Sequence, residues 1–161
     1  MAHSAAGLLL PPLAQRLNAV RQVWLAAVVA DYANGRSFAE ELSTDPEFVV
    51  SGEWLGANVA DDPVAAAYFL FHDCDLATLR GALPTVAVSD LSPLYAERPA
   101  YNPTTLPSTY LLPTQDRTVR PSWMRLVAQR RLSVDPVEID AGHNCYAAYP
   151  REVAAIIDGQ R

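Results

Sequence analysis

The chain has 161 residues and a mass of 17.5 kDa, which is the size of one ordinary globular domain. All 12 of its basic residues are arginine, and its 18 acids leave a net charge of −6. This acidic balance disfavours binding to nucleic acids or to anionic membranes, and the lack of lysine excludes Schiff-base and P-loop lysine chemistry.

The first third of the sequence predicts a helix followed by a buried strand. Residues 5–17 carry helical periodicity, but Pro11 and Pro12 predict a kink or a late start, because proline disrupts a helix beyond its first turn. Residues 19–30 are almost continuously apolar and rich in valine, which favours a strand that is buried on both faces.

The middle of the sequence, residues 31–107, lacks clean strand signals. Short helices are predicted at 38–42, 63–72 and 76–83, the last with Asp75 as its N-cap. Residues 92–107 are predicted to form an extended connection, because prolines interrupt them repeatedly. A stretch this long between core elements is typical of a functional cap or lid.

The last third alternates between strands and helices. Strands are predicted at 108–113 and 137–140, and helices at 121–132 and 150–159. This alternation predicts an α/β fold with a parallel sheet of about three strands flanked by helices.

Compartment and metal content follow from two cysteines and the N-terminal sequence. Cys74 and Cys145 form no C-x-x-C motif and no Cys/His quartet, so we expect reduced thiols in a cytoplasmic protein, with neither metal nor cofactor. No apolar stretch reaches the roughly 18 residues of a membrane span, and the N-terminus lacks the basic segment of a secretory signal.

Three polar residues occupy positions where α/β sheets place their chemistry. Ser4 stands in Ala2-His3-Ser4-Ala5-Ala6-Gly7, similar to the nucleophile elbow G-x-S-x-G with alanine in place of both glycines. Asp116 follows the strand at 108–113, and His143 follows the strand at 137–140. Taken singly, each has an ordinary alternative: a helix cap, a loop acid or a surface histidine.

The order serine, aspartate, histidine resembles that of the α/β-hydrolase triad. The sequence around the three residues, with YFLFHDCDLATL at 68–79, resembles the C-terminal part of esterases related to methyl-salicylate esterases and hydroxynitrile lyases. The resemblance implies a partial α/β-hydrolase fold over 1–161, with 31–107 as a helical cap inserted in it.

The resemblance also implies a role for each residue. Ser4 would attack a small carboxylic ester, His143 would act as general base and acid, and Asp116 would orient the imidazole. The backbone N–H of Ala5 would supply one oxyanion donor. Aromatic residues of the cap would line the substrate pocket, and composition points to Trp54, Tyr68 and Phe69.

Other polar residues offer rival interpretations. Asp31 is a second possible acid, ranked below Asp116, whereas Asp140 lies too close in sequence to orient His143. Cys145 is placed poorly for a dyad with His143, and the run at 72–75 is interpreted as a helix junction and not as a metal site.

The resemblance also predicts that something is missing. Such hydrolases have about five strands before the nucleophile, so half of a domain of about 230–290 residues would be absent. The strand at 20–30 would then expose a long apolar edge that favours self-association, Ser4 would lie on a loose chain end, and the chain alone would be weakly active or inactive. The alternative is a non-catalytic α/β binding fragment, and the lack of lysine disfavours a lyase.

Overall fold

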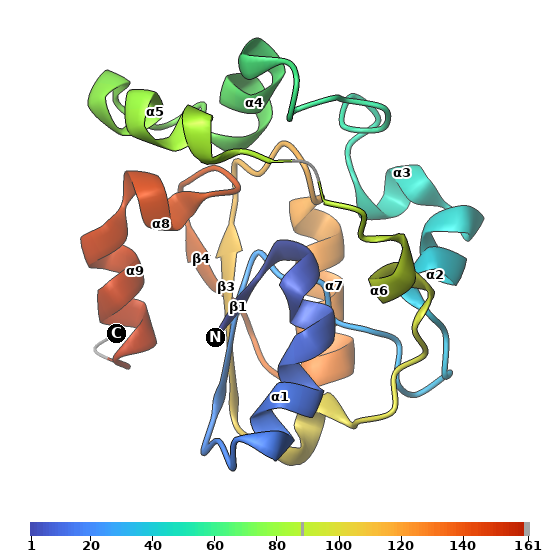
Figure 1. The fold of residues 1–161 in the computed structure, drawn as a ribbon. Coiled ribbons are helices and arrows are strands. Elements are labelled where there is room, and N and C mark those ends of the chain that lie inside the picture. The colour runs from blue at the N-terminus through green and yellow to red at the C-terminus, as the bar shows by residue number, and fades with distance from the viewer. Residues whose placement is uncertain (88, 160–161) are drawn as a thin grey trace.

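The computed structural model describes residues 1–87 and 89–159, and it is built around a four-stranded parallel sheet (Figure 1). The strand order is β1-β2-β3-β4, which is also the order along the chain. The strands are β1 (Ala2–His3), β2 (Gln22–Leu25), β3 (Ser108–Pro113) and β4 (Val137–Ile139). All three pairings are parallel, so the carboxyl ends of all four strands lie at one edge of the sheet.

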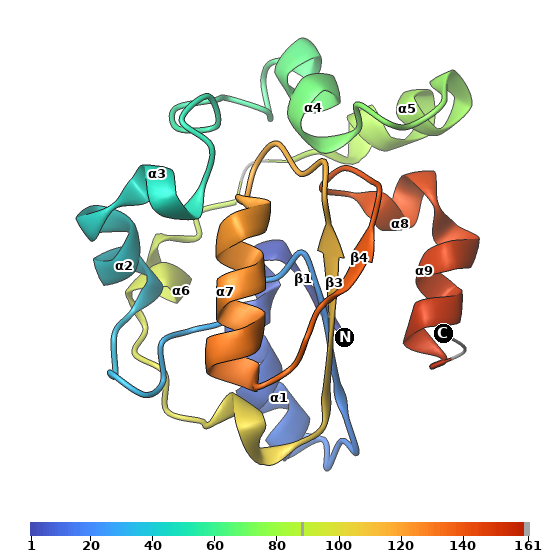
Figure 2. The same cartoon turned by 180° about the vertical axis from the view of Figure 1, so that it is seen from behind.

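Helices cover both faces of the sheet. Helices α1 (Leu10–Arg16) and α7 (Pro121–Leu132) lie on one face, and α8 (Cys145–Ala148) and α9 (Pro150–Ile157) lie on the other (Figures 1 and 2). Successive strand residues serve opposite faces, because side chains alternate along a strand. The predicted α/β fold with a parallel sheet is therefore confirmed.

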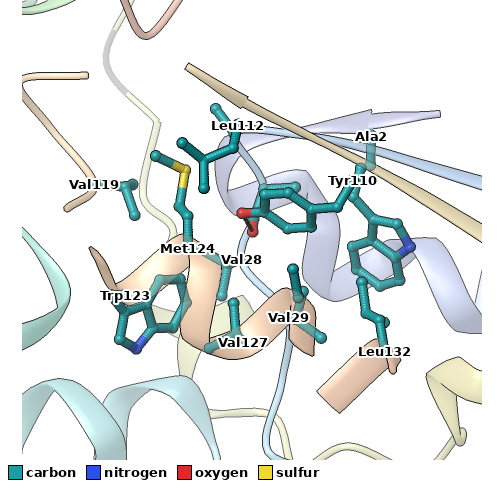
Figure 3. Close-up of a cluster of buried hydrophobic side chains, with 14 of the residues drawn as sticks. Ala2, Val28, Val29, Tyr110, Leu112, Val119, Trp123, Met124, Val127 and Leu132 are labelled. Atoms are coloured by element: carbon teal, nitrogen blue, oxygen red, sulfur yellow. Dashed lines mark hydrogen bonds between the residues drawn. The ribbon is translucent and has the colours of Figure 1, made fainter. Parts of the chain in front are cut away.

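The larger core lies between the sheet and α7 (Figure 3). Trp24 and Tyr110 are paired in register on β2 and β3, and both are fully buried on this face. The Tyr110 hydroxyl donates a 2.7 Å hydrogen bond to the Ala27 carbonyl, so this buried polar group is satisfied. Helix α7 contributes a fully buried stripe that includes Trp123, Met124 and Val127.

The smaller core lies between the opposite face and α9. Leu25 and Leu111 are paired in register, point away from the first core and pack with residues of the C-terminal helices. Val153 and Ile156 of α9 are buried against them, which agrees with the amphipathic helix predicted at 150–159.

The N-terminal helix begins late. Residues Ser4–Leu9 form a 3₁₀ helix, and α1 starts only at Leu10, with Pro11 and Pro12 in its first turn. The prolines have no N–H to donate, and the first turn of a helix is where that loss costs least. The predicted late start is confirmed.

The segment between β2 and β3 divides into two groups of short helices. One group packs beside α7: α2 (Phe38–Thr44), α3 (Pro46–Val49) and α6 (Ser92–Ala96). The other group, α4 (Pro63–Leu70) and α5 (Leu76–Ala82), lies across the carboxyl edge of the sheet (Figure 1). Single 3₁₀ turns, Leu83–Thr85 and Pro103–Thr105, complete the connection to β3.

Helix caps explain where several of these helices begin. Ser37 and Glu40 form a reciprocal capping box at α2, and Asp75 accepts a 2.7 Å hydrogen bond from the Thr78 N–H at α5, as predicted. Part of the expected extended connection at 92–107 is instead the short helix α6, with Pro93 in its first turn.

Two expectations about the strands need correction. β2 ends at Leu25 and not near residue 30, because Ala26 adopts a left-handed conformation (φ 45°) that breaks the strand. The sheet has four strands and not about three, because Ala2 and His3 pair with Trp24 and Leu25 and cover half of the β2 edge that was expected to be bare.

Within residues 1–87 and 89–159, no helix combines the length and the apolar character that a bilayer crossing requires.

Candidate active site

The structure joins Asp116 and His143 at the carboxyl edge of the sheet. The Oδ2 atom of Asp116 lies 2.7 Å from Nδ1 of His143, and both side chains are almost completely buried. A carboxylate accepts hydrogen bonds, so this contact assigns the imidazole proton to Nδ1 and leaves Nε2 as an acceptor. The two residues come from loops that follow β3 and β4, so the parallel sheet brings them together.

The Asp116 carboxylate is fixed by its own loop. Its Oδ1 atom accepts hydrogen bonds from the Thr118 N–H at 2.7 Å, the Thr118 hydroxyl at 2.9 Å and the Val119 N–H at 3.1 Å. The Thr118 oxygen also lies 2.9 Å from Nδ1 of His143. Oδ2 is thus left to accept from the imidazole, in an orientation that the loop imposes.

Ser4 lies on the sharp turn between β1 and the 3₁₀ helix. Its φ of 53° is in the left-handed region, which is strained for a residue other than glycine and is typical of functional turns. The Ser4 carbonyl accepts a 3.0 Å hydrogen bond from the Val28 N–H, so the turn is tied to the segment after β2. The serine is therefore anchored, contrary to the loose chain end that was expected.

Gly7 makes this anchoring possible. A Cβ atom at this position would lie 2.1 Å from the carbonyl oxygen of Val28, so no larger residue fits without moving the backbone. The alanines at positions 2 and 6 are accommodated, and the close approach that needs a glycine occurs at residue 7, one position beyond the G-x-S-x-G pattern.

No hydrogen bond joins the Ser4 hydroxyl to His143 among the residues that the structure describes. The two are linked through His3, which directly precedes the serine. Its ring lies 4.6 Å from the His143 ring, and its Nε2 atom is 3.1 Å from the His143 carbonyl oxygen. Hydrogen bonds between a nucleophile and its base are often long before substrate binds.

His3 is held in its neutral form. Burial is the main cause that lowers its pKa from 6.5 to about 4, and the positive charge of a protonated His143 lowers it further. The hydrogen bond to the His143 carbonyl and the charge of Asp116 act in the opposite direction but are weaker. The lowered pKa of His3 therefore lets its uncharged ring pack directly against the His143 ring.

The three aromatic residues expected to line a pocket lie together. The Phe69 ring is buried and contacts Trp54 and Tyr68 edge-to-face, at centroid distances of 5.3 and 4.9 Å. Tyr68 is exposed, its hydroxyl donates to Glu53, and the guanidinium of Arg117 lies 4.4 Å from its ring centroid. The cluster therefore abuts the loop of Asp116, and its role as a pocket wall stays a prediction.

The rival residues have other partners. The Asp31 carboxylate accepts two 2.9 Å hydrogen bonds from the Asn34 side chain, and Asp140 accepts from Gln115 at 3.0 Å. Cys145 is buried, and burial raises the pKa of its thiol to about 12, so it is a poor nucleophile. Both cysteines are unpaired.

Cavities and metal-ligand clusters away from the Asp116–His143 pair are the other places where a site could form. A cavity of about 600 Å³ lies along α1, and its lining includes Leu9, Leu13 and Tyr101 but not Ser4 or His143. Among residues 1–87 and 89–159, no cluster of three or more His, Cys, Asp or Glu side chains is arranged to hold a metal ion.

Solved structures share this arrangement of elements across nearly the whole chain. Two structures of polyneuridine aldehyde esterase match with TM-scores of 0.79 and 0.75, at 16% and 15% identity, over 99% of this chain and 70% of theirs. A pyrethroid hydrolase matches with a TM-score of 0.65 at 13% identity, over 98% of this chain and 67% of its own. The fold matches part of the α/β-hydrolase fold. No protein-family model and no curated protein sequence matches the chain.

Sequence reasoning missed several residues of this candidate site. Thr118 and His3 flank the Asp116–His143 pair, yet no local pattern marks a threonine or a histidine as a neighbour of a distant side chain. The helix junction predicted at 72–75 lies between α4 and α5. Its polarity is not incidental, however, because His72 and Asp73 contact the loops of the site. Their adjacency in an otherwise apolar stretch was the available signal.

Proposed function

We propose that the chain is a serine hydrolase that cleaves small carboxylic esters, with Ser4 as nucleophile, His143 as base and Asp116 as the residue that orients it. The observation that carries the proposal is the buried 2.7 Å hydrogen bond between Asp116 and His143 Nδ1. Ser4 stands in a left-handed turn, and the residue before it, His3, packs on the His143 ring. The α/β-hydrolase fold, shared with an esterase and a pyrethroid hydrolase, supports it.

The reaction would follow from this geometry in two steps. Ser4 Oγ attacks the ester carbonyl carbon while its proton passes to Nε2 of His143, and the resulting oxyanion accepts a hydrogen bond from the Ala5 N–H. The carbon–oxygen bond then breaks, and the imidazolium returns the proton to the leaving alkoxide. Water repeats the sequence on the acyl-enzyme and releases the acid.

The position of Ala5 supports its role as an oxyanion donor. It is the second residue of the 3₁₀ helix Ser4–Leu9, and the first N–H groups of a helix have no acceptor within the helix. Losing one donor of an oxyanion hole typically lowers the rate by about 10²–10³-fold. We assign one oxyanion donor within the described residues. We therefore expect ester turnover to be about 10²–10³-fold slower than in an oxyanion hole with two donors.

The segment over the carboxyl edge is proposed to bound the substrate site. Helices α4 and α5 lie across this edge, and the cluster of Trp54, Tyr68 and Phe69 lies beside the Asp116 loop. A largely apolar wall with few polar groups suits a small ester. We therefore keep 31–107 as the proposed cap.

A fluorophosphonate probe tests the proposal directly, because it forms a covalent bond only with an activated serine. We expect labelling at Ser4, no labelling of the Ser4→Ala variant, and slow p-nitrophenyl acetate turnover that His143→Ala abolishes. Mass spectrometry locates the modified residue. Folded wild-type protein in which Ser4 stays unlabelled would overturn the proposal and favour the binding-fragment alternative.

Two expectations from the sequence accompany the proposal. We infer a cytoplasmic location from the two unpaired cysteines, and self-association along β1, which has a strand neighbour on one side only. Sedimentation velocity at several concentrations checks the second expectation, and a purely monomeric chain contradicts it.

A further inference from the structure

Two consecutive residues between α4 and α5 reach down to the site. The Nε2 atom of His72 lies 3.0 Å from the backbone carbonyl of Gln115, the residue directly before Asp116. The Oδ2 atom of Asp73 accepts a 2.6 Å hydrogen bond from the backbone N–H of Gly142, which directly precedes His143. His72 and Asp73 thus contact the backbone of the residues that directly precede Asp116 and His143.

A residue larger than glycine at position 142 would displace the His72 and Asp73 side chains from this contact. A Cβ atom on Gly142 would lie 2.7 Å from His72 Nε2 and 2.9 Å from Asp73 Oδ1. Gly142 therefore lets the two side chains pack directly on the histidine loop.

The other carboxylate oxygen of Asp73 does not take part in this contact. Its Oδ1 atom is buried and has no hydrogen-bond partner among the described residues. An unsatisfied buried oxygen is unfavourable, so folding stability alone does not account for the carboxylate. The single strong contact it makes, to Gly142, points to a positional role.

We propose that His72 and Asp73 form a two-point clasp that sets the spacing between Asp116 and His143. The two loops follow different strands, β3 and β4, and the clasp ties both to one turn of the segment that covers them. His72 and Asp73 are then positioning residues that act through the loops, and their effect on turnover rests on the function proposed above. Asp116 and His143 then keep their spacing only while the α4–α5 segment stays packed on their two loops.

Paired variants separate positioning from general support of the fold. Asp73→Ala and His72→Ala remove the two contacts, whereas His72→Gln keeps a side-chain N–H donor and Asp73→Asn keeps an oxygen acceptor. Asp75→Ala is the matched control, because Asp75 caps α5 through the Thr78 N–H in the same turn. One readout is the low-field proton resonance of His143 Nδ1–H in protein labelled with ¹⁵N-histidine. The other is kcat and KM for p-nitrophenyl acetate.

We expect both alanine variants to shift or broaden the His143 resonance and to lower kcat by about 10²-fold with little change in KM, the size expected for a displacement of about 1 Å. His72→Gln and Asp73→Asn should restore most of kcat. Asp75→Ala should leave the resonance and kcat unchanged. If Asp73→Ala does not fold, His72→Ala tests the clasp by itself, because it keeps the Asp73 carboxylate.

Wild-type resonance and kcat in both alanine variants would overturn the clasp, and so would an equal loss in Asp75→Ala, since that loss would be a general effect on the segment. The two proposals fail in different ways. A wild-type protein without fluorophosphonate labelling contradicts the serine hydrolase, and the resonance still decides the clasp.

Discussion

Acid sensitivity provides a direct test of how His3 is packed against His143. We consider His3→Gln, which removes the titrating ring but keeps a side-chain N–H that can donate to the His143 carbonyl. In the wild type, burial lowers the pKa of His3 from 6.5 to about 4. Between these two pH values the unfolded chain binds a proton that the folded chain rejects.

The sign and size of the effect follow from this difference. Stability falls as the pH drops from 6.5 towards 4, because protons then favour the unfolded state. A shift of this size corresponds to about 3 kcal/mol of unfolding free energy at pH 4, and to nothing above pH 6.5. His3→Gln lacks this contribution, so it should lose about 3 kcal/mol less than the wild type over this pH range.

Urea unfolding at pH 7.0, 5.5 and 4.5 measures the difference. All other titrating groups are common to both proteins, so comparing their pH slopes isolates His3. Tyr146→Phe is the control: its ring contacts His3 edge-on at 5.1 Å, and the variant should keep the wild-type slope. Parallel slopes for wild type and His3→Gln would refute the buried, neutral His3.

Two further substitutions test the turn and the loop of the site. Gly7→Ala places a Cβ 2.1 Å from the Val28 carbonyl oxygen, and it should lower the unfolding free energy measured in urea by about 3 kcal/mol. The control is Gly81→Ala in α5, where the added Cβ meets open space, so this variant should be as stable as the wild type or more stable. Equal effects of the two substitutions would contradict the close approach at Gly7. Thr118→Val removes a buried hydroxyl that donates to Asp116 and should lower the unfolding free energy by about 2 kcal/mol, and an unchanged urea midpoint would show that this hydrogen bond is unimportant.

Much of the fold follows from local patterns. The strand at 108–113 and the helix at 121–132 have the predicted bounds, because a β-branched and aromatic apolar run and a proline in the first turn are local signals. β1 was missed because two residues carry no detectable period, and their pairing with β2 depends on how the chain returns. β2 ends early because Ala26 adopts a left-handed backbone conformation, and no residue pattern around it predicts this conformation.

The site divides in the same way. The sequence by itself determined the order of Ser4, Asp116 and His143 and their positions at strand ends, because parallel strands bring their carboxyl ends to one edge. Only the tertiary structure decided the rest. Asp116 and not Asp31 contacts His143, the His3 ring packs on the His143 ring, and His72 and Asp73 bind the loops on both sides of the pair. These contacts join residues far apart in the chain, and hydrogen bonds of this kind depend on atomic positions that the packed sheet and its covering helices set.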